Sequence, residues 1–396
     1  MSLNDLHPLT KAIRLRSPQT LQNEHSTPLY LTSSFTFDEA EAMRAAFADE
    51  TDDNIYSRFS NPNVDEFIAK MCMLENADAG FATSTGMSAV FASMFALLQQ
   101  GDHLLCCSSV FGSTFTVVTK YLPKYGITCT LVPANDKEAW EAAVQSNTKM
   151  VYLETPTNPQ LEVIDLEWAG QFSKKHNLIL NVDNCFATPL LQRPIEYGAD
   201  LVVHSATKWI DGQGRVMGGI VVGREDLIKE IYLFCRNTGP ALSPFNAWVL
   251  SKSLETLDVR MQRHCANALK VAEALQNHQN VAWVKYPFLP NHPQYEIAKK
   301  QMAFGGGILC FEIKGGLEAG RRFLDNLQML SVTANLGDSR SIASHPASTT
   351  HSKLTDAQRS AVGITPGLIR ISCGLEKDDD IIADISQALN QSAAKV

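Results

Sequence analysis

Short apolar runs alternate with stretches of helical periodicity through much of the first half of the chain, from about residue 64 to residue 223. Strands separated by helices in this way are typical of a mostly parallel sheet that is covered on both faces. We therefore predict a large α/β domain. Its strands are expected at residues 102–108, 127–132, 150–153, 178–182, 201–203 and 219–222.

The pattern differs on either side of this region. The first fifty or so residues are mostly polar and predict an arm that carries one short helix at 38–47. A long helical periodicity over 244–275 leads into a smaller α+β region. Its strands are expected at 307–313 and 368–372, and its helices at 317–327 and 378–389. We divide the chain into an arm (1–54), a large domain (55–250) and a C-terminal domain (251–396).

Length and composition agree with two folded domains in a cytoplasmic protein. The 396 residues are 45% hydrophobic, which allows two sizeable cores. A net charge of -8 offers no basic surface to nucleic acid or to an anionic membrane. The nine cysteines form no CxxC motif, and neither a signal peptide nor a long apolar run is visible. We expect a reducing compartment and no nucleic-acid or membrane partner.

The strongest candidate for chemistry is Lys208, which ends the run Leu-Val-Val-His-Ser-Ala-Thr-Lys at residues 201–208. A lysine after a strand can form a Schiff base with a carbonyl cofactor. The hydroxyls of Ser205 and Thr207 can hold a phosphate. A lone lysine at such a place is more often a solvated loop residue, but this combination favours pyridoxal phosphate (PLP).

Asp183 follows the apolar run at residues 178–182 and lies at another predicted strand end. Ligands of open α/β sheets bind beyond the carboxyl ends of the strands, so Asp183 and Lys208 can face one site. A carboxylate there would keep a pyridine nitrogen protonated. A turn-forming aspartate is the alternative interpretation.

A third motif, Thr-Ser-Thr-Gly-Met-Ser-Ala-Val at residues 83–90, joins a short apolar stretch to a predicted helix. The free N–H groups of a helix start attract anions, and Gly86 would let the backbone approach a phosphate. Hydroxyl residues before a glycine are also ordinary helix-start chemistry. The motif therefore supports the PLP interpretation without defining it.

Metal and dinucleotide sites are weaker alternatives. No HExxH motif or CxxC pair is present, so we expect no metal site. The glycines at residues 212–219 are spaced one residue too far apart for a dinucleotide fingerprint, and they follow a loop where that fingerprint needs a strand.

Taken together, these residues resemble the cystathionine γ-synthase family of PLP enzymes, also called the Cys/Met metabolism family. The resemblance runs from about residue 30 to the C-terminus. It implies PLP fold type I and a homodimer with shared active sites, and we expect the dimers to pair into a homotetramer. The matching motifs are YSRFSNP (56–62), STGM (84–87), ETPTNP (154–159), DN (183–184), SATK (205–208) and NLGD (335–338).

The resemblance also implies residue roles. Lys208 would bond the cofactor and move protons, while Asp183 would pair with the pyridine nitrogen. Asn158 would contact the ring oxygen of the cofactor, and Asn335 and Arg370 would bind the substrate α-carboxylate. The phosphate would be held by Gly86, Met87, Ser205 and Thr207 of one subunit and by Tyr56 and Arg58 of its neighbour. Tyr56 would also act in catalysis.

Phe111 departs from the family pattern, which usually has tyrosine there. The ring can still stack on the cofactor, but the phenol is missing. Lyases that split thioethers release a thiolate, whose thiol has a pKa of about 8.5, so an acidic partner helps them. A carboxylate of pKa about 4 leaves an ester without a proton. Phe111 therefore favours O-acyl substrates.

Arg340 is a second departure, because the lyases of the family commonly carry glutamate there. The segment at residues 335–341 is similar to that of the homoserine sulfhydrylases. A cation here could attract the second carboxylate of a succinyl ester, which an acetyl ester lacks. Acetyl-using relatives also tend to be basic at this place, so Arg340 does not settle the acyl group. The compact chain length resembles the succinyl enzymes.

We predict a PLP-dependent transferase of methionine biosynthesis. It would convert an O-acylhomoserine, succinyl favoured over acetyl, and sulfide to homocysteine by γ-replacement. A lysine that moves protons must be a free amine, so burial and nearby cations should lower the pKa of Lys208. The alternatives are cystathionine γ-synthase, methionine or cystathionine γ-lyase, and a cofactor-free binding protein on the same scaffold.

Overall fold

A seven-stranded sheet forms the centre of the larger domain in the computed structural model, which describes residues 5–349, 352, 355, 359 and 363–393. The strand order is β1-β7-β6-β5-β4-β2-β3. Only β7 runs antiparallel to its neighbours, β1 and β6. The strands are β1 (Ala79–Thr83), β2 (His103–Cys107), β3 (Thr128–Val132), β4 (Thr148–Glu154), β5 (Ile179–Asp183), β6 (Leu201–His204) and β7 (Gly219–Gly223).

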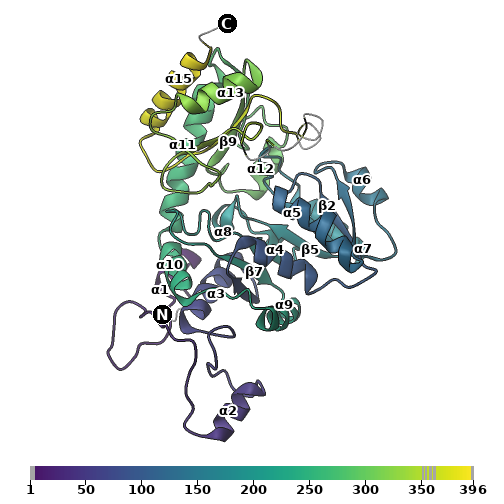
Figure 1. Cartoon of the computed structure of the whole chain (residues 1–396), viewed down its shortest axis with the longest axis vertical. Helices are drawn as coiled ribbons and strands as arrows, with labels where there is room; N and C mark the ends of the chain where they lie inside the picture. The colour runs from purple at the N-terminus through teal and green to yellow at the C-terminus, as the bar shows by residue number, and fades with distance from the viewer. Residues whose placement is uncertain (1–4, 350–351, 353–354, 356–358, 360–362, 394–396) are drawn as a thin grey trace.

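Helices connect these strands (Figure 1). Strands β2, β6 and β7 are buried along their whole length. Since successive side chains point to opposite faces, both faces of the sheet are covered. The helical elements are α1 (Pro8–Arg14), α2 (Ala40–Phe47), α3 (Pro62–Glu75), α4 (Gly86–Phe95), α5 (Gly112–Thr116), η2 (Val117–Tyr121), η3 (Leu122–Tyr125), α6 (Lys137–Ala142), α7 (Leu166–His176), α8 (Thr188–Leu191), η4 (Pro194–Tyr197), α9 (Glu225–Thr238) and α10 (Pro244–Leu254).

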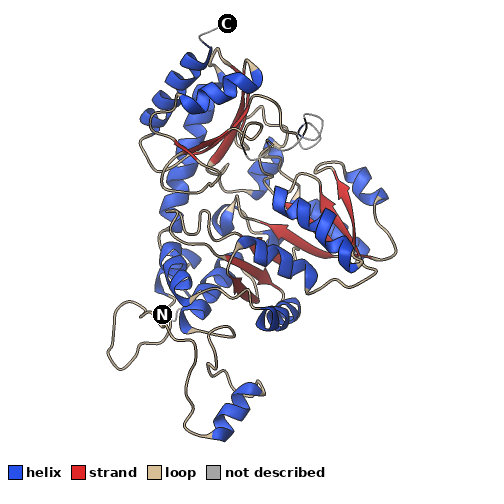
Figure 2. Cartoon of the chain, viewed as in Figure 1, coloured by secondary structure: helices blue, strands red, loops and turns tan. Residues whose placement is uncertain are grey.

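A smaller mixed sheet of order β10-β11-β12-β9-β8 forms the second domain (Figure 2). Buried apolar side chains such as Phe311, Phe323 and Ile369 fill its core. The predicted α/β class, with a large mostly parallel sheet and a smaller sheet domain, is therefore confirmed. The elements are α11 (Leu257–Gln276), β8 (Val281–Lys285), α12 (Tyr295–Gln301), β9 (Ile308–Ile313), α13 (Gly316–Asp325), β10 (Ser331–Val332), β11 (Ile342–Ser344), β12 (Leu368–Ser372) and α15 (Asp378–Ala393).

The helical periodicity over 244–275 belongs to two helices, α10 and α11, rather than one. Thr256 interrupts them with φ -114° and ψ 6°. No glycine or proline lies at the break, so the sequence pattern carried no signal for it. The predicted boundary between residues 250 and 251 lies inside α10, and the domain limits stay a prediction. Among the described helices, none is both long and apolar enough to cross a membrane.

Candidate active site

A cavity of about 260 Å³ lies where β4, β5 and β6 end, beside the start of α4. The strands run parallel, so their carboxyl ends meet at one edge of the sheet. Side chains from all three strand ends and from the second domain line this cavity. Its lining includes Gly86, Met87, Phe111, Glu154, Asn158, Asp183, Cys185, Ser205, Thr207, Lys208 and Arg370.

Lys208 lies on the turn that follows β6, in the wall of the cavity. Its Nζ donates a hydrogen bond to Asn335 Oδ1 at 2.8 Å. Burial lowers the pKa of Lys208, and the positive charge of Arg370 lowers this pKa further, while Cys185 opposes the shift. A lowered pKa favours the neutral amine, which is the form that bonds a carbonyl and accepts a proton.

Asp183 is the last residue of β5 and lines the same cavity. Its Oδ1 accepts a hydrogen bond from the Cys185 N–H at 3.0 Å, and its Oδ2 accepts one from the Tyr152 hydroxyl at 3.3 Å. Burial raises the pKa of Asp183, although these two donors oppose the shift. A cation next to this carboxylate would restore its ionised form, as a protonated pyridine nitrogen does.

The start of α4 forms the opposite end of the cavity. Thr85 caps the helix by accepting the Ser88 N–H, which leaves the N–H groups of Gly86 and Met87 available to an anion. A Cβ at residue 86 would lie 2.5 Å from the Ser205 Cβ. Only glycine allows this close approach, so the helix start and the Ser205 hydroxyl face the same small volume.

Glu154 is a buried residue of the site. In the sequence it stood only within the motif at residues 154–159, and no role was predicted for it. Its Oε2 accepts the Phe111 N–H at 2.7 Å, and its Oε1 accepts the Asn158 N–H at 3.0 Å. Burial and the negative charge of Asp183 raise the pKa of Glu154. The available signal was its position directly after an apolar run, the same signal that pointed to Asp183 after β5.

Arg370 enters the cavity from β12 of the second domain. Its Nη1 donates to Asn158 Oδ1 at 3.0 Å and its Nη2 to the Asn335 carbonyl at 3.1 Å. Among the residues that the structure describes, none is a hydrogen-bond partner of the buried Nε. Burial lowers the pKa of Arg370 to about 10. A buried cation with a free donor is suited to a carboxylate ligand.

Four predicted residues are not in the lining of this cavity: Asn335, Tyr56, Arg58 and Arg340. Asn335 borders the adjoining cavity and meets the site through the hydrogen bond from Lys208. Tyr56 and Arg58 border a separate cavity of about 330 Å³ on the N-terminal arm, where Arg58 donates to the Arg236 carbonyl. Arg340 is 65% exposed and forms an ion pair with Asp338 at 2.8 Å. The contact of Arg340 with substrate stays a prediction, and so does the contact of Tyr56 and Arg58 with a neighbouring subunit.

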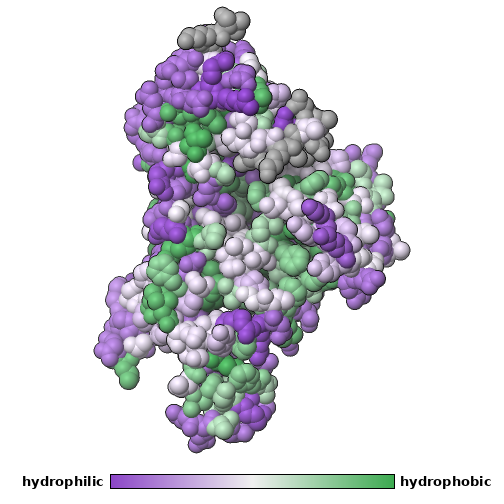
Figure 3. Space-filling model, in the orientation of Figure 1, coloured by the Kyte–Doolittle hydropathy of each residue, from purple (hydrophilic) through white to green (hydrophobic). Residues whose placement is uncertain are grey.

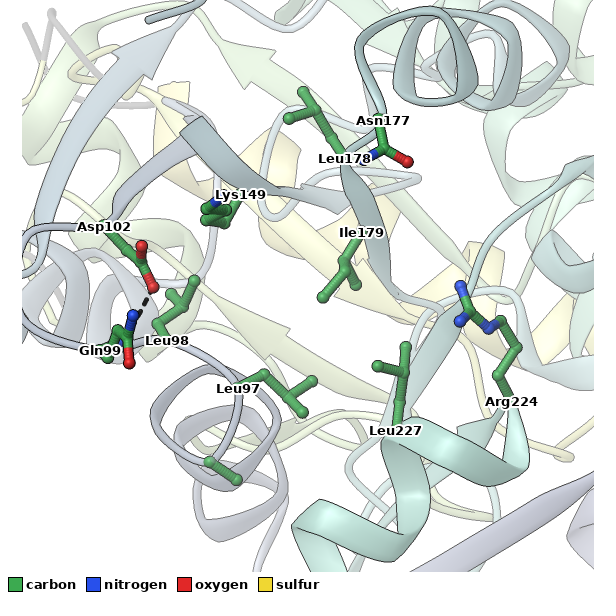
Figure 4. Close-up of a pocket in the computed structure, with 11 residues that line it drawn as sticks. Leu97, Leu98, Gln99, Asp102, Lys149, Asn177, Leu178, Ile179, Arg224 and Leu227 are labelled. Atoms are coloured by element: carbon green, nitrogen blue, oxygen red, sulfur yellow. Dashed lines mark hydrogen bonds between the residues drawn. The ribbon is translucent and has the colours of Figure 1, made fainter. Parts of the chain in front are cut away.

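A larger cavity, of about 590 Å³, lies elsewhere. It borders the amino ends of β2, β4 and β5, at the edge of the sheet opposite to Lys208. Leu97, Ile179 and Leu227 surround it, with Lys149 and Arg224 at its border (Figure 4). Its one drawn hydrogen bond, from the Gln99 N–H to Asp102, is a local turn contact. Its one lysine, Lys149, is exposed, and the described lining contains no serine, threonine or glycine that could hold a phosphate beside that amine.

The residues around Lys208 fit PLP at each end of that molecule. A buried amine can bond its aldehyde, and Asp183 can pair with its ring nitrogen. Gly86 packs so close to Ser205 that any Cβ at residue 86 would collide with that side chain. The backbone N–H groups at the start of α4 therefore lie beside the Ser205 hydroxyl, and both can donate to a phosphate. Phe111, which lines the same cavity, would stack on the ring of the cofactor.

Comparison with known proteins agrees with this chemistry. Residues 9–390 match the family described as Cys/Met metabolism PLP-dependent enzyme. An O-succinylhomoserine sulfhydrylase of Pseudomonas aeruginosa is 45% identical over 96% of this chain and 94% of its own. An L-methionine gamma-lyase of Porphyromonas gingivalis is also 45% identical, over 92% of each chain.

A solved structure from Campylobacter jejuni, assigned as an O-acetylhomoserine (thiol)-lyase, superimposes with a TM-score of 0.93. It is 33% identical, covers 97% of this chain and 100% of its own, and holds N'-pyridoxyl-lysine-5'-monophosphate. The fold is therefore PLP fold type I, the cofactor is PLP, and the alternative of a cofactor-free binding protein is wrong. The chain belongs to the Cys/Met metabolism family of PLP-dependent enzymes.

Proposed function

We propose that the protein catalyses γ-replacement on an O-acylhomoserine, with sulfide as the nucleophile and homocysteine as the product. The observation that carries the proposal is Phe111 in the cavity wall, fixed through its N–H by Glu154. Phe111 has no phenol with which to protonate a departing thiolate, whereas a carboxylate of pKa about 4 leaves unprotonated. The activity in the name of the Pseudomonas aeruginosa relative supports the same reaction.

The residues of the cavity divide the work as follows. Arg370 binds the substrate α-carboxylate through its unpartnered Nε, and Asn158 and Asn335 hold the guanidinium in place. When bound, PLP supplies an electron sink that stabilises negative charge at the substrate Cα. Lys208, as a neutral amine, takes the Cα proton, gives it up within the site and, as a neutral amine again, takes a Cβ proton. The acyl group leaves Cγ as a carboxylate, hydrosulfide bonds to Cγ, and Lys208 returns both protons.

We propose a succinyl rather than an acetyl ester as the natural substrate. Arg340 Nη2 donates to the Gln213 carbonyl at 3.2 Å, beside a second cavity of about 460 Å³. This second cavity shares Thr207 and Met217 with the first, so a longer acyl chain has room to extend toward it. A terminal carboxylate there would compete with Asp338 for Arg340.

Steady-state rates with purified holoenzyme test the proposal. Homocysteine should form from sulfide and O-succinylhomoserine with a higher kcat/KM than from sulfide and O-acetylhomoserine. Replacing sulfide by cysteine tests cystathionine synthesis on the same preparation. If cysteine supported a higher kcat/KM than sulfide, the enzyme would be a cystathionine γ-synthase and the proposed nucleophile would be wrong.

A methionine γ-lyase is the second candidate, because a relative of that name is as similar as the sulfhydrylase. Methionine alone, without sulfide, separates the two functions. A methionine γ-lyase should release methanethiol and ammonia from methionine as fast as it turns over its best substrate. We expect release from methionine to be far slower than homocysteine formation, because Phe111 cannot supply the proton that a thiolate needs.

We further propose a homodimer with shared active sites that pairs into a tetramer, and a cytoplasmic location. Support for the dimer comes from the arm, where Tyr56 and Arg58 lie away from the Lys208 cavity of their own chain. Large apolar side chains are exposed on this arm, among them Leu31, Met43 and Phe47. Figure 3 shows green apolar surface on the arm around α2. A partner subunit would cover such a surface.

A further inference from the structure

Arg260 on α11 contacts the turn that carries Lys208, although it lies about fifty positions later in the sequence. The side chain is buried, with 6% of its surface exposed. Its Nη1 donates to the Trp209 carbonyl at 2.6 Å and its Nη2 to the Ile210 carbonyl at 3.2 Å. Nη2 also donates to the Ser253 carbonyl at 2.9 Å, near the end of α10. The guanidinium therefore joins the Lys208 turn to the junction between α10 and α11.

The turn needs these donors because of its own hydrogen bonds. The Asp211 N–H donates to Ala206 and the Gly212 N–H to Lys208, as in a short piece of helix. The carbonyls of Trp209 and Ile210 lie at the end of this helical piece, where no following turn supplies N–H donors to them. Both residues are buried, so water cannot easily replace those partners. The planar fork of an arginine can serve two such carbonyls at once.

The backbone leaves little freedom around this contact. Gly212 has φ +70°, and a Cβ there would lie 2.1 Å from Arg260 Nη1. On the other side, a Cβ on Gly337 would lie 2.7 Å from the Trp209 N. The turn is thus enclosed between α11 and the loop of the second domain that also carries Asn335.

His264 extends the contact by one turn of α11. Its ring packs against the Trp209 ring with centroids 4.8 Å apart, and its Nδ1 donates to the Cys373 carbonyl at 2.7 Å. Arg260 therefore holds the backbone of the residue after Lys208, while His264 packs against the side chain of that residue. Lys208 directly precedes Trp209 in the chain, so these contacts from α11 constrain where the Lys208 side chain leaves the turn.

We propose that Arg260 is a positioning residue for Lys208: it caps the turn and so fixes the direction of the Lys208 amine toward the cofactor aldehyde. Arg260 itself touches neither substrate nor cofactor. The proposal rests on Lys208 being the cofactor lysine, and it does not depend on which acyl group or nucleophile the enzyme uses.

Arg260→Lys and Arg260→Gln test this role in the holoenzyme. Arg260 reaches the three carbonyls from two nitrogens, whereas the donors of a lysine or a glutamine all lie on one nitrogen, so neither replacement reproduces the planar fork. Both variants should bind PLP, but the pH midpoint of its visible absorption should shift by about half a unit or more, because the surroundings of the Lys208 amine change. The visible circular dichroism should weaken, and kcat should fall roughly tenfold or more with a smaller change in KM.

Arg263→Gln is the matched control, since Arg263 lies on the same helix and is exposed. It should keep the wild-type spectrum and pH midpoint. Gly212→Ala crowds Nη1 from the side of the turn and provides a second perturbation of the same contact if the Arg260 variants do not fold. We expect it to change the spectrum in the same direction.

Two results would overturn the role of Arg260. One is a wild-type pH midpoint and visible circular dichroism in every folded variant, with only the unfolding temperature lowered. The other is a borohydride-reduced cofactor adduct that maps to a lysine other than Lys208. The spectra need no substrate, so a normal Arg260 effect without homocysteine formation would reject the proposed reaction and leave the positioning role intact.

Discussion

At the scale of single residues, the site depends on a few side chains whose surroundings change their chemistry. Lys208 is an ordinary lysine until burial and Arg370 lower its pKa, which makes the neutral amine accessible. Arg370 remains a buried cation with an unpartnered Nε, which suits a carboxylate. In the proposed reaction Phe111 bears on the leaving group and Arg340 on the acyl chain, and each can be changed without touching Lys208.

Phe111→Tyr should leave O-acylhomoserine turnover within roughly tenfold, because the added phenol does not help a carboxylate to leave. The same phenol should raise any weak release of methanethiol from methionine. Parallel assays of homocysteine and methanethiol on one preparation measure both effects. Unchanged thioether cleavage in the variant would contradict the leaving-group argument.

Arg340→Ala should weaken the use of O-succinylhomoserine more than that of O-acetylhomoserine. The expected difference is about 1 to 3 kcal/mol in transition-state binding if the contact with the second carboxylate is charge-assisted. Values of kcat/KM for the two esters, with wild type and variant side by side, give this difference directly. Equal losses for both esters would exclude Arg340 from acyl recognition.

At the scale of elements, Glu154 joins segments that come from different places in the chain. One oxygen holds the N–H of Phe111 at the start of α5, and the other holds the N–H of Asn158 in the loop after β4. Asn158 in turn accepts a hydrogen bond from Arg370 on β12. A single carboxyl group therefore links the Phe111 side of the cavity to the Arg370 side.

Glu154→Gln keeps the shape of the side chain but places an amide NH2 against one of the two N–H groups. Leaving such a donor unsatisfied costs about 1 to 3 kcal/mol, so we expect kcat/KM to fall roughly tenfold or more. Glu162→Gln is a suitable control, because Glu162 accepts from the Ser109 hydroxyl at 3.0 Å, which can also donate to an amide oxygen. Equal activity in the two variants would show that the Glu154 contacts do not align the site.

At the scale of the whole molecule, the arm is the part that a single chain leaves unexplained. It extends from the body and carries α2 at its end (Figure 1). Tyr56 and Arg58 lie at its base, outside the cavity that holds Lys208. A symmetric dimer would bring the arm of one chain to the cavity of the other, so that each site combines residues of both.

Mixing two inactive variants tests this sharing. Arg58→Ala and Lys208→Ala homodimers should both be poor enzymes. After the two are unfolded and refolded together, about half of the dimers are mixed, and each mixed dimer has one intact site and one doubly damaged site. About a quarter of all sites should therefore regain full activity. Activity equal to the average of the two parents would show that Arg58 serves the site of its own chain.

The sequence by itself determined the α/β class, most strands of the large sheet and the candidate roles of Asp183 and Lys208. It did not predict β1, β8, β10 or β11 as strands. Periodicity of two or of 3.6 residues is a local property, so it places strands and helices and shows where each strand ends. Parallel strands share their carboxyl edge, so the positions of Asp183 and Lys208 after two apolar runs were enough to expect them at one site. Thr85 as a helix cap and Gly86 as a close-approach residue were likewise readable within a few positions.

Only the tertiary structure decided the contacts that join distant positions. Phe111 and Glu154 are 43 positions apart, Lys208 and Asn335 are 127 apart, and Asn158 and Arg370 are 212 apart. The break between α10 and α11 is visible only in the structure, and the carbonyls that Arg260 holds lie about fifty positions before it. The reason is physical: a local pattern records which face of an element is buried, whereas the partner of a polar group depends on which other elements the fold brings beside it.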